Sequence, residues 1–169
     1  VPFVSSIQPS ARARAAGASV EVDISRLQPG EKMVIEWRGR PVWILHRTPE
    51  MIASLEKIEP RLADPESERT VFPIPEYARN RNRSIKPEFL VAVGVCTHFG
   101  CSPTSRFTPG DQPGLPSDWP GGFFCPCHGS AFDLSGRVFA NMPAPDNLEI
   151  PPHQYLSDTL LLVGEDQQA

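Results

Sequence analysis

Two short loops that combine cysteine with histidine constrain this chain more than any other feature. Residues 96–101 read CTHFGC, and residues 125–130 read CPCHGS. Each string places a thiol and an imidazole two or three residues apart and carries one further cysteine. The chain has 4 cysteines, and all of them lie in these two strings, which indicates one local site in place of a disulfide framework. The residue types predict a metal site with two sulfur and two nitrogen ligands.

The residues alone leave three other interpretations open. The cysteines and histidines can simply pair or pack, although two matching clusters make that a poor explanation. A structural zinc site with two Cys and two His is chemically reasonable, but zinc spacings seldom leave an extra cysteine beside each ligand pair. An all-cysteine cluster would use both cysteines of the second string, and Pro126 between them restricts their convergence on one iron.

The remaining sequence predicts a mostly β domain with one short helix. Alternation and β-branched runs predict strands, including a hairpin whose turn spans residues 38–41. Thr48 followed by Pro49 is a typical helix start, with a hydroxyl N-cap and proline at the first helical position. Residues 59–87 and 106–122 are expected to be irregular. The expected strands are Val20–Ile24, Met33–Trp37, Val42–Leu45, Phe89–Val95, Val138–Phe139, Leu148–Ile150 and Thr159–Val163.

Charge and hydropathy exclude two classes of protein. The net charge of −4 argues against a nucleic-acid binder, and Arg79, Arg81 and Arg83 are expected to form a solvated surface. No run approaches the roughly 18 apolar residues of a membrane helix. Because the sequence starts at Val1 without methionine, we expect that a signal or membrane anchor has been removed upstream. Residues 1–18 are predicted to be a flexible tether.

The two strings resemble the paired boxes of the Rieske iron–sulfur proteins, C-T-H-x-G-C and C-P-C-H-G-S, and both are complete here. Over nearly the whole chain, the sequence also resembles the Rieske subunit of the proteobacterial and mitochondrial ubiquinol–cytochrome c reductase (the cytochrome bc complex). The supporting strings are Val1–Ser6, Ala16–Ala18, Glu36–Gly39, Cys96–Thr104, Pro143–Pro145 and Asn147-Leu148.

The resemblance implies a site and a fold. One 2Fe–2S cluster would be ligated by Cys96 and Cys125 on its inner iron and by His98 and His128 on its outer iron. Cys101 and Cys127 would form a disulfide, and the Ser130 hydroxyl would bond a bridging sulfide. The fold would be three stacked antiparallel sheets with one short helix. The implied ranges are 19–169 for the Rieske domain, about 89–146 for its cluster-binding part, and Pro143–Pro145 for a proline loop covering the cluster.

The implied function is electron transfer from ubiquinol to a c-type cytochrome. Neutral imidazoles in place of two thiolates raise the cluster potential from about −400 mV into a range of about −150 to +300 mV, where quinol can donate. At the cytochrome b subunit, His128 would bond the quinol while His98 titrates beside it. The head would then swing on its tether, on the periplasmic side of the bacterial inner membrane. Isolated, it would be an electron carrier and not a complete enzyme.

Two other roles are alternatives for a chain with these two strings, and three positions depart from the family pattern. The small subunit of arsenite oxidase is the main alternative; the N-terminal domain of a ring-hydroxylating oxygenase would need a downstream catalytic domain. Phe132 occupies the position of a tyrosine that bonds a ligand thiolate in many relatives. We therefore expect the cluster to have a lower reduction potential than in tyrosine-bearing relatives. Phe99 stands where leucine is usual, and Met142 replaces a glycine before the proline loop.

Overall fold

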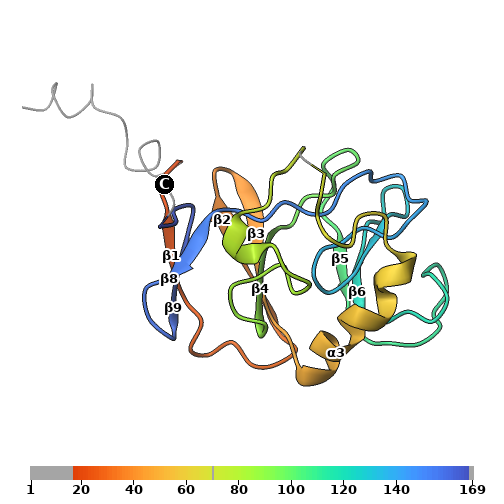
Figure 1. Ribbon diagram of the computed structural model, residues 1–169, viewed down its shortest axis with the longest axis horizontal. Helices are drawn as coiled ribbons and strands as arrows, with labels where there is room; N and C mark the ends of the chain where they lie inside the picture. Colours follow the sequence, from red (N-terminus) through yellow and green to blue (C-terminus); the bar gives the residue numbers. More distant parts are fainter. Residues whose placement is uncertain (1–16, 70, 168–169) are drawn as a thin grey trace, which may run out of the picture.

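The strands of the chain form three antiparallel sheets that follow one another across the molecule (Figure 1). The computed structural model describes residues 17–69 and 71–167. The expectation of a mostly β domain with three sheets is confirmed. In spatial order, the first sheet is β1 (Val20–Asp23), β9 (Leu160–Val163) and β8 (His153–Tyr155); the second is β2 (Lys32–Trp37), β3 (Arg40–His46) and β4 (Phe89–Val93); the third is β5 (Thr104–Arg106), β6 (Gly122–Phe124) and β7 (Ala131–Phe132).

The middle sheet separates two hydrophobic cores, because successive side chains of a strand point to opposite faces. Along β3, Val42 and Ile44 belong to the core shared with the first sheet. Trp43 and Leu45 belong to the other core, which also contains Cys96 and Cys125. Both faces of β3 are buried, which explains why its apolar residues follow one another without alternation. The candidate metal site lies in the second of these cores, away from the first sheet.

The helix forms as the sequence predicts, and so does the hairpin, although its turn is shorter than the predicted residues 38–41 because Arg40 and Pro41 already belong to β3. The two turn residues Arg38 and Gly39 have φ of 52° and 72°, the left-handed pair that a two-residue hairpin turn requires. Helix α3 (Pro49–Ile58) is capped by Thr48, whose hydroxyl accepts a hydrogen bond from the Met51 amide. Two short 3-10 helices, η1 (Glu59–Arg61) and η2 (Glu76–Ala78), lie in the irregular stretch. No helix in the described ranges has the length and apolar character to cross a bilayer.

Several expectations about local structure are wrong or fall outside the described residues. Leu148–Ile150 is not a strand, since Leu148 donates to Gly136 while the Glu149 carbonyl accepts from Val93 on a different segment. Val138–Phe139 makes only isolated bridges. The three short strands of the third sheet were not predicted. Of the predicted tether at residues 1–18, residues 1–16 lie outside the described ranges.

Arg83 corrects the expectation of a solvated arginine cluster, because only 2% of it is exposed. It joins the buried Arg47 and Arg137 around the turn at residues 133–137, which follows β7. Arg83 and Arg47 bond mainly to carbonyl and hydroxyl oxygens, and burial lowers the pKa of both guanidinium groups to about 10. Both remain charged at neutral pH. These arginines tie the turn at residues 133–137 to the irregular stretch.

Candidate metal centre

The first Cys/His string forms a loop that leaves the end of β4 and closes on itself. The amide of Cys96 donates to the carbonyl of Cys101 at 2.7 Å, and the amide of Gly100 donates back to the carbonyl of Cys96 at 3.0 Å. Gly100 has φ of 81°, a conformation that glycine adopts without steric cost. The intervening residues 97–99 are held in a tight turn that carries His98 at its centre.

The second string repeats this backbone arrangement between β6 and β7. The amide of Cys125 donates to the carbonyl of Ser130 at 2.8 Å, and that of Gly129 donates to the carbonyl of Cys125 at 2.9 Å. Gly129 has φ of 84°, nearly the same as its counterpart in the first loop. The second loop differs in that its histidine comes three residues after the cysteine instead of two. Two equivalent loops thus present one free cysteine and one histidine each.

The free cysteines of the two loops meet inside the core. Cys96 and Cys125 are each only 2% exposed, and neither takes part in a disulfide. Their side chains hydrogen-bond to one another, and the Ser130 hydroxyl also bonds the Cys96 sulfur. Burial raises the pKa of the Cys96 thiol, because a lone thiolate would be a buried negative charge. A pair of adjacent, buried sulfurs is a suitable start for a metal site.

The histidines of the two loops lie together nearer the surface. The ring centroids of His98 and His128 are 4.8 Å apart, with the rings nearly perpendicular. His98 is half-buried, while His128 is exposed. The Phe99 ring lies 3.9 Å from that of His98 and is 73% exposed, so an apolar surface borders the two imidazoles. The structure therefore brings the two free cysteines together in the core and the two histidines together nearer the surface.

One unsatisfied atom tests whether a metal cluster fits this site. Nδ1 of His98 is buried and has no hydrogen-bond partner among the described residues. Buried polar atoms in native proteins nearly always have a partner, and coordination to a metal satisfies an imidazole nitrogen equally well. Two sulfurs and two imidazoles with such a nitrogen fit a histidine-ligated iron–sulfur cluster. The sulfurs of Cys101, Cys125 and Cys127 also lie within 4.8 Å of one another. This group does not fit a metal cluster, because Cys101 and Cys127 are joined in a disulfide.

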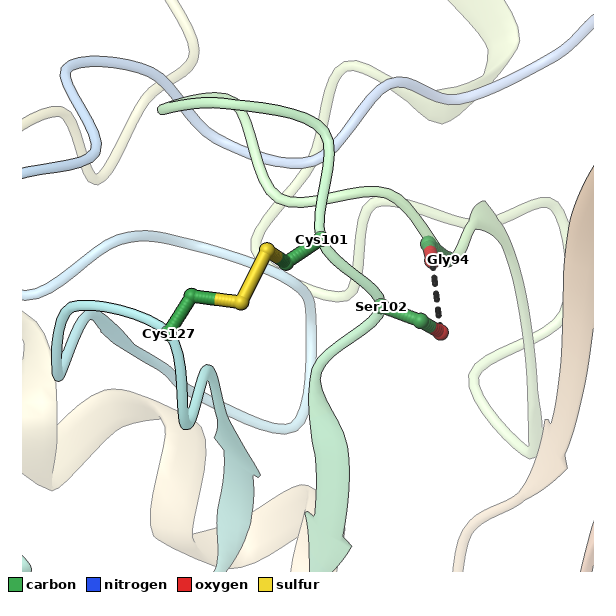
Figure 2. Close-up of a disulfide and its surroundings, with 4 residues drawn as sticks. All are labelled: Gly94, Cys101, Ser102 and Cys127. Atoms are coloured by element: carbon green, nitrogen blue, oxygen red, sulfur yellow. Dashed lines mark hydrogen bonds between the residues drawn. A yellow bond between two sulfur atoms is a disulfide. The ribbon is translucent and has the colours of Figure 1, made fainter.

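A disulfide between Cys101 and Cys127 joins the two loops (Figure 2). Its residues are 26 apart in sequence and their Cα atoms are 6.6 Å apart, which confirms the pairing that the family resemblance implied. Beside it, the Ser102 hydroxyl donates to the carbonyl of Gly94 at 3.2 Å and secures the exit of the first loop. Closing a loop of this length stabilises a fold by about 3 kcal/mol in the chain-entropy model.

The proline loop, Pro143–Pro145, is attached to both ligand loops. The amide of Ala144 donates to the Ser130 hydroxyl at 2.8 Å. The hydroxyl of Thr97 donates to the carbonyl of Asp146, just beyond the loop, at 2.6 Å. Sequence reasoning did not single out Thr97, although its place between two ligand candidates was a usable signal. Phe132, at the position where the family pattern has a tyrosine, is fully buried and brings no hydroxyl donor to the site.

Comparisons with known proteins match this chain to one family. The Rieske [2Fe-2S] domain model matches residues 74–152. The ubiquinol-cytochrome c reductase iron-sulfur subunit of Allochromatium vinosum is 62% identical over 169 residues, covering 99% of this chain and 79% of that protein. The corresponding subunit of Bradyrhizobium diazoefficiens is 39% identical over 164 residues, covering 96% and 81%. A solved chain of a hyperthermophilic respiratory Complex III, 24% identical, covers 95% of this chain and 85% of its own length, with a TM-score of 0.55, and supports the fold.

Proposed function

Since this chain belongs to the Rieske iron–sulfur subunits of ubiquinol–cytochrome c reductases, we propose that Cys96, His98, Cys125 and His128 hold its [2Fe-2S] cluster. The observation that carries the ligand set is the buried, partnerless Nδ1 of His98 beside two free, buried cysteines. Cys96 and Cys125 would bind the inner iron. The histidines, which lie nearer the surface, would bind the outer iron.

Each polar group around the site has a role in electron transfer. The bound cluster supplies a one-electron acceptor with a potential of about −150 to +300 mV. The Ser130 hydroxyl donates a hydrogen bond toward sulfur, which stabilises the more negative reduced state and raises the potential. The disulfide and the proline loop hold the two ligand loops in one arrangement. Phe99, which is exposed beside the imidazoles, offers an apolar contact to quinone.

The two imidazoles move the proton. His128, the exposed ring, accepts a hydrogen bond from the quinol hydroxyl and takes its proton as the electron is transferred. His98 lies beside it as the second proposed histidine ligand. The head then delivers the electron to the c-type cytochrome of the complex. We place this cycle between the cytochrome b subunit and that cytochrome, on the periplasmic side of the membrane, with residues 19–169 moving as one domain.

Iron analysis and EPR of the dithionite-reduced holoprotein test the ligand set. We expect two irons per chain and a rhombic signal with the low average g value of histidine-ligated clusters. His128→Gln should lose this signal, whereas His46→Gln, at a histidine bonded to the Leu27 carbonyl far from the site, should keep it. A colourless protein that carries zinc would overturn the proposal. The 62% identity over nearly the whole chain supports the reductase in preference to an arsenite oxidase small subunit.

A further inference from the structure

We propose that Asn147 is a positioning residue that holds the proline loop against the ligand loops, with residues 64–67 of the irregular stretch as its anchor. The inference rests on the proposed ligand set, since it assigns a role to residues behind that site. Asn147 is only 6% exposed and follows Pro145 by two residues. The position of Asn147 therefore sets the direction of the chain after the proline loop.

The side chain of Asn147 makes three hydrogen bonds. Its Oδ1 accepts from the amide of Val138 at 2.8 Å. Its Nδ2 donates to the carbonyl of Asp64 at 2.9 Å and to the hydroxyl of Ser67 at 3.1 Å. Only a side chain with one acceptor and two donors in this planar arrangement can make all three bonds. The partners come from segments far apart in sequence, so the amide joins the proline loop to the irregular stretch.

The anchor is itself rigidly held. The Ser67 hydroxyl accepts a second hydrogen bond, from Nε of the buried Arg83 at 2.8 Å, so both of its lone pairs are used. Arg83 also donates to the carbonyl of Leu148, the residue after Asn147, at 2.8 Å. The carboxylate of Asp64 accepts from the amides of Glu68 and Arg69 and closes the segment into a turn. The anchor residues thus support one another.

The proline loop is consequently held on two sides. On the site side, the amide of Ala144 bonds the Ser130 hydroxyl. On the other side, Asn147 bonds Asp64 and Ser67 of the anchor, so the chain just after the proline loop can move away from the anchor only if these bonds break. If the loop moved, Ser130 would lose the bond that orients its hydroxyl toward sulfur.

Asn147→Asp in the holoprotein tests the inference, because it keeps the shape and replaces both donors by acceptors. Losing these bonds should accelerate iron loss to a chelator about tenfold at temperatures well below the melting transition. Deuterium uptake at the Ala144 amide should rise, and the reduction potential should fall. The matched control is Leu161→Ala in the core of the first sheet, which should lower the melting temperature but leave the other readouts unchanged.

Ser67→Ala is a milder variant that keeps the bond from Asn147 to the Asp64 carbonyl. It should move the same readouts in the same direction by a smaller amount, and it carries the test if Asn147→Asp does not fold. The inference is wrong if both variants behave like Leu161→Ala, with lowered melting temperatures and unchanged potential and Ala144 exchange. A wild-type protein without the histidine-ligated EPR signal would instead overturn the ligand set, and this inference with it.

Discussion

The amide of Ala144 donates a 2.8 Å hydrogen bond to the hydroxyl oxygen of Ser130, and both residues are buried. Because this oxygen acts as the acceptor, the hydroxyl proton remains free for donation. The acceptor of this proton is the sulfur of Cys96, which hydrogen-bonds the Ser130 side chain. A single hydroxyl therefore couples the proline loop to a proposed ligand atom, and the position of that loop affects the electrostatics of the metal site.

Ser130→Ala should lower the reduction potential. Removing a hydrogen bond to sulfur destabilises the reduced state by about 1 kcal/mol, which corresponds to about 40 mV for one electron. Protein-film voltammetry measures the shift. Ser102→Ala is the matched control, since its hydroxyl bonds the Gly94 carbonyl beside the disulfide and does not reach a proposed ligand (Figure 2). Equal potentials for the two variants would refute the assigned role of Ser130.

Phe132→Tyr should raise the potential. The ring is fully buried in the core that contains Cys96 and Cys125, and a phenol there would supply the donor that tyrosine-bearing relatives are expected to use. We expect a rise of about 40 mV, again about one hydrogen bond. Phe139 and Trp119 belong to a third buried cluster that contains neither Cys96 nor Cys125, so Phe139→Tyr should leave the potential unchanged. A potential unaffected by Phe132→Tyr would show that this position does not tune the cluster.

Replacing Cys101 and Cys127 together by serine should weaken the site without abolishing the fold. The unfolding free energy should drop by about 3 kcal/mol, because the denatured chain regains the freedom that the cross-link removes. Denaturant titration checks the stability, and the rate of iron loss to a chelator checks the site. The first sheet should keep its hydrogen-exchange protection, since its core does not include either cysteine. Unchanged rates of iron loss would mean that the proline loop alone holds the loops together.

The buried His153 predicts a pH dependence of stability away from the site. Burial lowers the pKa of its ring below the usual 6.5, and its Nε2 has no partner among the described residues. The unfolded chain therefore binds a proton that the folded chain does not, so stability should decrease as pH falls below about 6.5. His153→Asn, which keeps a donor for the Pro151 carbonyl, should flatten this slope in urea titrations between pH 5 and 7. An unchanged slope would mean that groups other than His153 cause the pH dependence of stability.

The parts of the fold that local sequence determines were predictable. The hairpin needs a turn of two left-handed residues, and Arg38-Gly39 supplies it; the helix needs a cap, and Thr48 with Pro49 supplies it. The four residues proposed as ligands stand out because two rare residue types recur at short spacing. None of these features depends on distant contacts.

The features that sequence reasoning missed all depend on long-range contacts. The third sheet pairs Thr104–Arg106 with Gly122–Phe124 across an irregular loop, and its strands are too short to show alternation. Leu148–Ile150 has the alternation of a strand, yet its backbone bonds go to two different segments. Arg83 is charged and flanked by polar residues, but its burial depends on carbonyls and hydroxyls supplied from remote positions.

The pairing of β1 with β9, in which Val20 lies opposite Val163, has a mechanical consequence. A force transmitted along the backbone to Val20 acts first on the ladder of hydrogen bonds that pairs these two strands. That ladder packs on the face of the middle sheet opposite to the one that contacts the sulfur-bearing core. A force applied at this end would therefore act first on the first sheet, which the middle sheet separates from the core that contains Cys96 and Cys125.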